Sequence, residues 1–330
     1  MREQETQVYF NHMWNKRTDS LVTLITPVYN RRGVLPRALS SVNKQTYDNF
    51  EYIIVNDGSI QNLDDIVFEF MNNARFPVLY IKKENGGVHT ARNIATKHAR
   101  GYYWVNLDSD DELIPQAIEV LVNKWDAIPL EEKEKCFEVR ACCMNQNGER
   151  VGDLFPSKGK MSIEEWNKQC RKMSFENIAM RITQIMKDNL FPEPEGVKFV
   201  PEFLLWKKLE KSYLSYYVND IVRVYHLEPN DGIDDHLARN RNLSIRDVES
   251  VCWKSSYIIN NWSVYNYHFG IKGYFDTILR FCMYAHVLKK NGVDWKKYNF
   301  NKSFPKVLRV MLWWPTLPLQ YVYIKRRMSV

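Results

Sequence analysis

The acidic run Asp108-Ser109-Asp110-Asp111-Glu112 is the stretch of this 330-residue sequence whose residue types and spacing most directly allow chemistry. Carboxylates packed this closely repel one another unless a cation or a hydrogen-bond donor lies between them. A hard divalent metal is a natural neutraliser, because such cations prefer oxygen ligands. Asp108 and Asp110 alternate and can face one side, so that one binds the metal while the other holds a ribose hydroxyl or a metal-bound water. A metal held in this way would clamp phosphate oxygens.

Three further polar segments follow apolar runs, and each suits either a nucleotide ligand or a tight turn. Asp57 precedes a glycine in Asn56-Asp57-Gly58-Ser59 and can accept an N–H from the edge of a nucleobase, while Tyr29 can stack on the ring. Gly86-Gly87 allows close approach to the backbone and begins a helix whose N-terminus, with Arg92 nearby, suits an anion. Taken alone, these residues also fit ordinary turns, and the acidic run fits the solvated start of a helix. Their common position after predicted strands favours a ligand site.

The elements that position these motifs are short apolar runs with amphipathic segments between them. The predicted strands are residues 21–25, 50–55, 78–81 and 102–107, and the predicted helices are residues 34–42, 63–71 and 88–99. This order predicts an α/β fold with a doubly wound, mostly parallel, Rossmann-like sheet. In such a sheet ligands bind outside the carboxyl ends of the strands, which is where the four motifs fall.

The four motifs are T-P-V-Y-N, V-N-D-G-S, N-G-G-V-x-x-A-R-N-x-A and L-D-S-D-D, and in this order and spacing they cover roughly residues 21–112. In this combination the sequence resembles the family-2 glycosyltransferases. The resemblance implies an A-type glycosyltransferase fold that binds a nucleotide-diphosphate sugar, most often a UDP-sugar, together with Mn²⁺ or Mg²⁺. It also implies an inverting reaction, in which a carboxylate deprotonates the acceptor hydroxyl as that hydroxyl attacks the anomeric carbon.

The resemblance also assigns roles to residues of the motifs. Pro27, Tyr29 and Asp57 would hold the base, Arg92 and Asn93 would line the donor site, and Asp108 and Asp110 would bind the ribose and the metal. The residues expected to bind the nucleotide sugar are therefore Pro27, Tyr29, Asn30, Asp57, Gly86, Gly87, Arg92, Asn93 and Asp108, with Asp110 as the metal ligand.

The general base that the resemblance requires is expected in the second half of the chain, where relatives often carry Glu-Asp near a helix start. Val200-Pro201-Glu202-Phe203 offers Glu202 at such a place, with no aspartate after it. Glu202 is therefore the expected catalytic residue, although a glutamate there can also simply stabilise its helix N-terminus. Its rivals are Glu193, Glu195 and Asp231. His226 could approach the metal or the diphosphate, but a lone histidine is more often structural, and we leave it out of the expected metal site.

Beyond Pro115 the pattern is less regular. We expect a helix at 116–125, a strand at 137–144, polar and helix-prone sequence through Lys187, a helix at 202–211 and a strand at 216–227. The expected domains are an N-terminal extension at 1–20, a nucleotide-sugar-binding half at 21–115, an acceptor-binding half at 116–232 and a helical C-terminal module at 233–330. Six cysteines without C-x-x-C spacing are expected to be reduced and buried.

The C-terminus carries the positive charge. Residues 295–330 hold eight of the 46 basic residues and no acidic one, so the first 294 residues have a net charge of 38 minus 39, or −1. The tail at 304–328 is rich in tryptophan, tyrosine and branched aliphatics, but charged, proline and glutamine residues interrupt it, which argues against a bilayer span. We expect it to dock on an anionic membrane surface through Lys325-Arg326-Arg327; the alternative is packing on the catalytic domain.

The first 20 residues carry charges throughout and lack the apolar core of a secretory signal. The expected location is cytoplasmic and peripheral on the inner face of the cell membrane, where a glycan or polyprenyl-linked acceptor would be found. The resemblance implies that such an enzyme builds surface polysaccharide.

Two other classes of protein compete with this interpretation. A sugar-1-phosphate nucleotidyltransferase also needs an α/β sheet, a metal and a nucleotide, but it would have a Gly-rich basic loop after the first strand. A basic nucleic-acid-binding protein would explain the aromatic and cationic C-terminus but not the acidic run. We therefore expect no nucleic-acid partner.

Overall fold

The computed structural model describes residues 6–16, 19–156, 159–170, 173–226 and 244–298. The chain divides into two compact units, one made of Met1–Phe191 with Leu209–Ile233 and the other of Pro192–Lys208 with Asp234–Val330. Asp231 and the basic tail at 304–328 lie outside the described residues. The domain boundaries expected from the sequence remain predictions.

In the first unit the described strands form one 11-stranded sheet, in the order β1-β4-β3-β2-β5-β10-β7-β11-β6, with β8 paired to β7 and β9 to β11. The strands are β1 (Gln7–Phe10), β2 (Val22–Val28), β3 (Phe50–Asp57), β4 (Val78–Lys83), β5 (Tyr103–Asn106), β6 (Glu112–Leu113), β7 (Cys136–Asn145), β8 (Arg150–Val151), β9 (Gly159–Met161), β10 (Asn177–Ile182) and β11 (Leu214–Tyr225). The neighbours β4, β3, β2 and β5 are parallel, and so are β7 and β11. The predicted doubly wound, mostly parallel sheet is confirmed.

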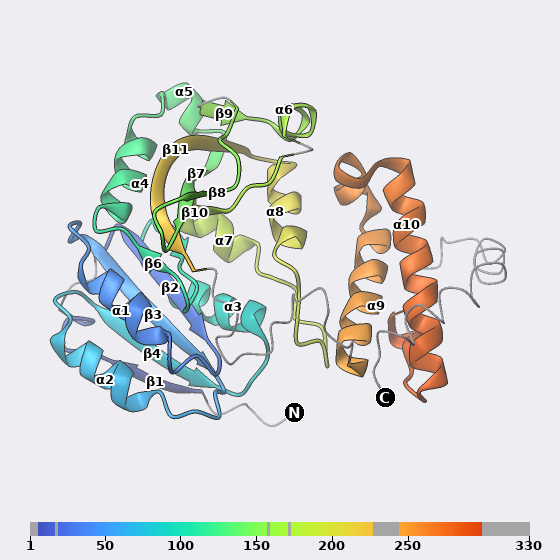
Figure 1. Cartoon of the computed structure of the whole chain (residues 1–330), viewed down its shortest axis with the longest axis horizontal. Coiled ribbons are helices and arrows are strands. Elements are labelled where there is room, and N and C mark those ends of the chain that lie inside the picture. The colour runs from blue at the N-terminus through green and yellow to red at the C-terminus, as the bar shows by residue number, and fades with distance from the viewer. Residues whose placement is uncertain (1–5, 17–18, 157–158, 171–172, 227–243, 299–330) are drawn as a thin grey trace. The chain divides into compact units, whose positions relative to one another are not determined.

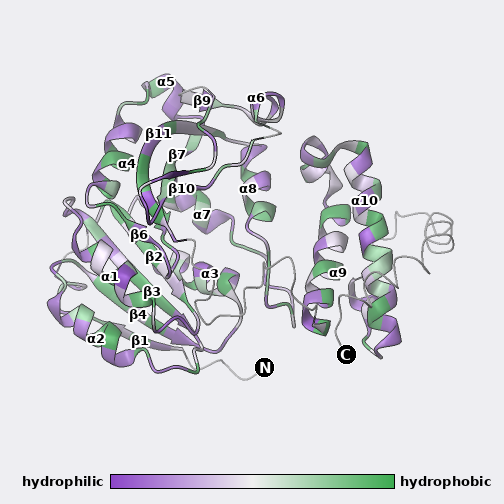
Figure 2. Ribbon diagram, viewed as in Figure 1, coloured by the Kyte–Doolittle hydropathy of each residue, from purple (hydrophilic) through white to green (hydrophobic). Residues whose placement is uncertain are grey.

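Helices cover both faces of this sheet (Figure 1). The helices α1 (Leu35–Asn43), α2 (Asp64–Asn73) and α4 (Ala117–Asp126) share one apolar cluster with alternate residues of β2 and β3. On the other face α3 (Val88–His98) packs on β2 and β3. All residues of β2 and β3 are consequently buried, as expected for parallel strands covered on both sides. Figure 2 shows the apolar character of these central strands.

Shorter elements complete the first unit: α5 (Leu130–Lys133), α6 (Ile163–Gln169) and α7 (Thr183–Asp188). A smaller apolar cluster forms beside the far part of the sheet, from Cys142, Phe155, Met161, Cys170 and Tyr217. All six cysteines of the chain are buried and unbridged, as expected.

Five of the described strands, namely β1, β6, β8, β9 and β10, are not expected from the sequence. The expected N-terminal extension contains β1, which pairs antiparallel with β4 at the edge of the sheet. The expectation of polar, helix-prone sequence through Lys187 is wrong at β8, β9 and β10. The strand β10 lies antiparallel between β5 and β7. The apolar pattern of β10 is interrupted by Arg181, whose Nε lies 2.9 Å from Oε2 of Glu138 on β7. A charged residue that is buried by an ion pair to a neighbouring strand thus interrupts the apolar pattern by which this central strand would have been predicted.

The second unit is helical, as predicted. The helix α8 (Phe203–Glu210) begins in it, and α9 (Ile245–Asn260), α10 (Trp262–Lys290) and the 3-10 turn η1 (Trp295–Tyr298) follow. The helices α9 and α10 pack against each other, and α10 has a kink at Gly270. Both helices mix hydrophobic and hydrophilic residues along their length (Figure 2). Among the described residues no helix combines the length and the apolar character needed to cross a bilayer.

Candidate functional site

The carboxyl ends of β2, β3, β4 and β5 lie at one edge of the sheet, because these neighbouring strands are parallel. The four sequence motifs lie at those ends or directly after them. The structure therefore places Tyr29, Asp57, Gly86-Gly87 and Asp108 along one edge, the usual place of a ligand site in such a sheet. Pro27 is part of β2 and is buried, whereas the Tyr29 side chain after it is 38% exposed.

Asn30 connects the first two loops of this edge. Its backbone N–H donates to Oγ of Ser59 at 2.9 Å, and its Oδ1 accepts from the N–H of Ile60 at 2.8 Å. Its φ of 52° lies in the left-handed region, which asparagine tolerates better than most residues. Asn30 thus fixes the direction in which the flanking Tyr29 and Arg31 leave the strand.

Asp57, which is only 2% exposed, connects the second and third loops. Its Oδ1 accepts from Nζ of Lys83 at 2.5 Å and from the N–H of Gly86 at 2.9 Å. Its Oδ2 accepts from the N–H of Gly87 at 2.8 Å and from Nδ2 of Asn85 at 3.3 Å. A carboxylate offers about four acceptor positions. The acceptor positions of the Asp57 carboxylate are therefore taken by Lys83 and by the loop that leads into α3.

The geometry of this turn depends on glycine at two points. Gly87 is the N-cap of α3 with φ 98°, and Gly58 has φ 71°. A Cβ on Gly58 would lie 2.5 Å from the backbone nitrogen of Asn85. The second and third loops therefore approach each other closely through their backbones.

Arg92 and Asn93 follow on α3, and both are buried. The Nε of Arg92 donates to Oδ1 of Asn106 at 3.1 Å, and its Nη2 donates to Oδ1 of Asp108 at 3.0 Å. Asn93 instead exchanges two hydrogen bonds with the backbone of Phe191, at 2.8 and 2.9 Å. Arg92 is thus joined to the acidic run, whereas the amide of Asn93 holds the end of a distant segment.

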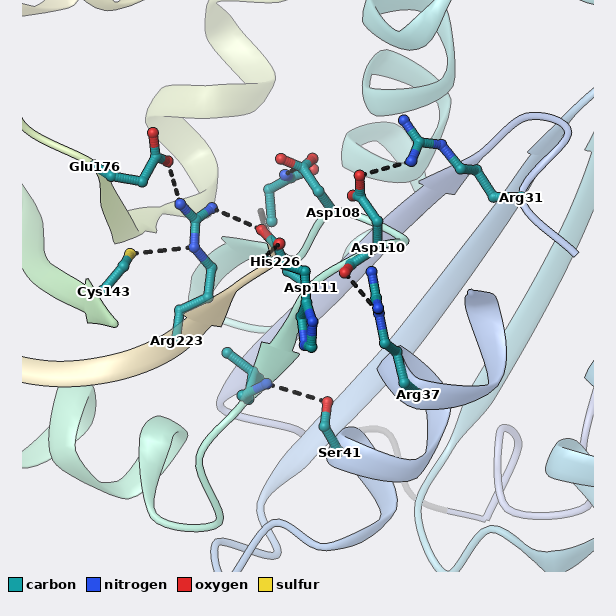
Figure 3. Close-up of polar contacts among 12 residues, drawn as sticks. Arg31, Arg37, Ser41, Asp108, Asp110, Asp111, Cys143, Glu176, Arg223 and His226 are labelled. Atoms are coloured by element: carbon teal, nitrogen blue, oxygen red, sulfur yellow. Dashed lines mark hydrogen bonds and ion pairs between the residues drawn. The ribbon is translucent and has the colours of Figure 1, made fainter. Parts of the chain in front are cut away.

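The carboxylate of each aspartate in the acidic run pairs with an arginine, and these three arginines come from different parts of the fold. Arg92 of α3 contacts Asp108, and Nη1 of Arg31, in the loop after β2, donates to Oδ2 of Asp110 at 2.8 Å. The third pair joins Asp111 to Arg223 on β11, with Nη1 and Oδ2 3.4 Å apart. Figure 3 shows Arg31 and Arg223 on opposite sides of the acidic run. Guanidinium groups therefore already relieve the repulsion for which the sequence suggested a metal.

The three carboxyl groups differ in their ionisation. Burial raises the pKa of Asp111 to about 8, against the opposing influence of Arg223 and with a further rise from Asp108 and Asp110. Partial burial would also raise the pKa of Asp108, but the Arg92 and Arg223 guanidinium groups outweigh this and hold that pKa below its usual value. The Asp108 side chain is therefore a carboxylate at neutral pH, whereas the raised pKa of Asp111 favours protonation of that side chain.

Arg223 and His226 were not among the residues expected to bind the ligand. Arg223 contacts Glu176 through Nη2 and donates from Nε to Sγ of Cys143 at 3.2 Å (Figure 3). The Nε2 of His226 lies 2.7 Å from Oε1 of Glu112, and its backbone N–H donates to Oδ1 of Asp111. The end of β11 therefore lies directly beside the acidic run and contributes a buried cation to it.

The acidic run has oxygen atoms that fit a divalent metal. Among the described residues, Oδ2 of Asp108 and Oδ1 of Asp110 accept no hydrogen bond and form no ion pair, and the two side chains are 40% and 29% exposed. Within the same described ranges no three His, Cys, Asp or Glu residues gather as a complete protein site for a metal. That is the usual situation for Mg²⁺, which takes one or two carboxylates and completes its shell with water and substrate phosphates. The donor set thus fits a metal that binds together with a nucleotide.

Glu202 lies immediately before α8, in the second unit. Its side chain is exposed, and its Oε2 accepts a hydrogen bond from Nε1 of Trp206 at 3.2 Å, one turn along the helix. Its rivals Glu193 and Glu195 are exposed in the same unit, and Asp231 lies outside the described residues. The role of Glu202 as the catalytic base remains a prediction.

Comparison with known proteins relates these features to one family. Residues 23–131 match the family model described as glycosyl transferase family 2. An uncharacterized glycosyltransferase of Rickettsia prowazekii, RP339, is 38% identical over 233 residues, which cover 69% of this chain and 68% of that protein. The chondroitin synthase of Pasteurella multocida is 37% identical over 106 residues, 32% of this chain. The aligned part is only 11% of the synthase, so the similarity is limited to a small piece of that larger protein.

Solved structures share the fold. TarS 1–349 of S. aureus in complex with UDP-GlcNAc superimposes with a TM-score of 0.56, covering 93% of this chain and 90% of that chain at 17% sequence identity. At this identity the likeness concerns the fold, and it confirms the predicted A-type glycosyltransferase architecture.

Proposed function

Since the chain belongs to glycosyltransferase family 2, we propose that it moves a sugar from a nucleotide-diphosphate sugar to a hydroxyl group of a glycan or lipid-linked oligosaccharide, with inversion at the anomeric carbon and with Mn²⁺ or Mg²⁺. Membership of this family makes the protein a glycosyltransferase and sets aside the nucleotidyltransferase and nucleic-acid-binding alternatives. The observation that carries the proposal is the pair of partly exposed carboxylates, Asp108 and Asp110, beside the loop that Asp57 holds.

The proposed donor is a UDP-sugar, either a UDP-hexose or a UDP-N-acetylhexosamine. Support comes from the fold shared with TarS, whose structure contains UDP-GlcNAc. In the proposed complex Tyr29 stacks on the base beside Pro27 and Asp57, and Asp108 accepts a hydrogen bond from a ribose hydroxyl. Arg92 keeps Asp108 ionised and oriented for this contact, because its guanidinium group is bonded to both Asp108 and Asn106.

In the proposed reaction Glu202 accepts the proton of the acceptor hydroxyl while the hydroxyl oxygen forms a bond to the anomeric carbon. The bond from that carbon to the diphosphate breaks, and the diphosphate leaves with the electron pair. Asp110 would hold the metal, which when bound neutralises the charge of the departing diphosphate. Arg37 donates from Nε to the backbone oxygen of Asp110 at 2.8 Å and so keeps this residue in place.

The proposed acceptor is a growing glycan of the cell surface. The sequence relationship to a chondroitin synthase, a protein named for a polysaccharide product, supports this class of acceptor. We further propose that the chain acts at the inner face of the cell membrane, with the basic C-terminal tail on anionic lipid. Flotation of the full chain with anionic and with neutral liposomes tests this: binding to both or to neither would contradict it.

Titration of UDP, GDP and CDP into the protein by calorimetry, with and without Mn²⁺, tests the donor assignment. We expect UDP to bind most tightly and to need Mn²⁺. Preference for GDP or CDP would overturn the donor class, and equal binding of UDP without metal would overturn the metal requirement. A screen of UDP-sugars for donor hydrolysis then identifies the sugar.

A further inference from the structure

Asp110 is held by two arginines in different ways. Arg37 bonds to its backbone oxygen, whereas Arg31 bonds to its carboxylate, with Nη1 2.8 Å from Oδ2. The Arg31 contact therefore occupies one of the two oxygens of the residue proposed as the metal ligand. A cation already present at a ligand affects how strongly a second cation binds there, because the two repel each other.

The ion pair of Arg31 differs from that of Arg92 in its environment. The Arg92 side chain is 4% exposed and is bonded to Asn106 as well as to Asp108. The side chains of Arg31 and Asp110 are 24% and 29% exposed, at the open edge of the sheet. Partly exposed ion pairs are weak, so the Arg31 pair can be exchanged for a stronger cationic partner. A divalent metal with diphosphate oxygens in its shell is such a partner.

We propose that Arg31 is an internal competitor for the metal: it pairs with Asp110 while the site is empty and lowers the affinity of the protein for Mn²⁺ until a nucleotide diphosphate brings additional ligands. Arg31 is a positioning residue in this scheme, since it acts through Asp110. The inference rests on the proposed metal dependence of the enzyme.

Neighbouring residues provide matched variants for the test. Arg32 also pairs with an aspartate, Asp65, at 2.5 Å, but both side chains are more exposed, at 40% and 55%, and Asp65 lies on α2 outside the acidic run. Arg32→Gln removes the same charge at the next position in the chain and serves as the control. Arg31→Lys keeps the charge at the position itself.

Free Mn²⁺ is measured by electron paramagnetic resonance during titration of the wild type, Arg31→Gln, Arg31→Lys and Arg32→Gln, each with and without UDP. Without UDP we expect Arg31→Gln to bind Mn²⁺ about fivefold more tightly than the wild type, the ratio equivalent to about 1 kcal/mol for a partly exposed pair. Arg31→Lys and Arg32→Gln should stay within about twofold of the wild type, and saturating UDP should reduce the advantage of Arg31→Gln.

Three results would overturn the inference. Equal Mn²⁺ affinity of the wild type and Arg31→Gln, with both binding Mn²⁺ in the presence of UDP, rejects the competition and leaves the metal dependence intact. Weaker binding by Arg31→Gln would mean that Arg31 assists the metal instead. Absence of Mn²⁺ binding by the wild type with UDP rejects the metal dependence itself and the inference with it. Thermal unfolding of each variant shows whether an altered affinity merely reflects a damaged fold.

Discussion

Lys83 and Asp57 form a buried ion pair beneath the first turn of α3, with Nζ and Oδ1 2.5 Å apart and side chains that are 4% and 3% exposed. The same Nζ donates to Oγ1 of Thr90 on α3 at 2.9 Å and to the backbone oxygen of Glu84 at 2.6 Å. Lys83 at the end of β4 thus joins the end of β3 to the start of the helix. These contacts hold the Gly86-Gly87 loop in position in the absence of a ligand.

Replacing Lys83 by methionine should destabilise the fold strongly, because Asp57 would stay buried without its cation. Removal of one partner of a buried ion pair costs about 3–5 kcal/mol. The control is Lys82→Met, which breaks the partly exposed pair between Lys82 and Asp64 and should cost no more than about 1 kcal/mol. Urea denaturation measures both. Similar losses in the two variants would show that the Lys83 pair adds nothing beyond a surface contact.

Gly58→Ala should disturb the same loop from the opposite side. The new Cβ would combine a φ of +71° with a contact 2.5 Å from the backbone of Asn85, which cannot swing away as a side chain can. Gly148→Ala isolates the first of these effects, because Gly148 has φ +81° and a Cβ there would have no atom within 4 Å. We expect Gly148→Ala to cost about 1 kcal/mol and Gly58→Ala clearly more, with weakened UDP binding. Unfolding and calorimetric titration of both variants give the comparison, and equal effects would exclude the backbone contact as the cause.

Glu138, on β7, provides a prediction for the dependence of stability on pH. Burial alone would raise the pKa of Glu138, but Arg140 and Arg181, with a hydrogen bond from Ser215, outweigh it and hold that pKa below the usual value. A carboxyl whose pKa is lowered by folding stabilises the protein above its unfolded pKa, and this contribution is lost as the pH falls. Glu138→Gln should therefore lower the free energy of unfolding at pH 7, and the difference from the wild type should shrink as the pH is lowered from about 5 toward 3.

The measurement for Glu138→Gln is urea denaturation across that pH range. Glu132→Gln is the control, because Glu132 pairs at the surface with Lys160. It should remain within about 1 kcal/mol of the wild type at every pH. A difference for Glu138→Gln that grows in acid would have the wrong sign and would contradict the assignment.

The sequence predicts the strands and helices of the N-terminal half of the sheet, where the local hydrophobic pattern agrees with the burial of the residues in the folded protein. The strands β2, β3, β4 and β5 are continuous apolar runs followed by turn residues, and these patterns survive because helices cover both faces. The strand β10 was not predicted, because it contains a charged residue, Arg181, that is buried and forms an ion pair with another strand. Such a pair depends on residues that only the folded chain brings together.

The same reason explains which site residues were missed. The motifs at the strand ends indicate Asp57, Asp108 and Asp110 as candidates, but they do not indicate the cations that pair with these residues. Arg31 is 79 residues from Asp110 in the sequence, and Lys83 is 26 residues from Asp57. A lysine or arginine within a few residues of the end of a predicted strand was the available signal, although it does not identify the acidic partner.

Asp110→Ala should abolish turnover, because it removes the proposed metal ligand. A bound metal supplies several kcal/mol of charge stabilisation to the leaving group, so the rate should fall by about a hundredfold or more. Asp65→Ala serves as the control, since Asp65 is an exposed aspartate that is also paired with an arginine. Transfer from a UDP-sugar is the assay, once the donor is known. Near-normal turnover by Asp110→Ala would remove Asp110 from the metal site.

Glu202→Gln should keep donor binding but lose transfer. The substitution preserves the size of the side chain and an oxygen that can accept from Trp206, yet it removes the ability to take a proton from the acceptor hydroxyl. Loss of a general base costs about 10²–10⁴-fold in rate, so kcat should fall in this range while the Kd for UDP stays within about twofold. Glu193→Gln and Glu195→Gln, at exposed positions of the preceding loop, should retain transfer. If one of them loses transfer and Glu202→Gln does not, the base is that residue, and the loop before α8 provides it in place of the helix start.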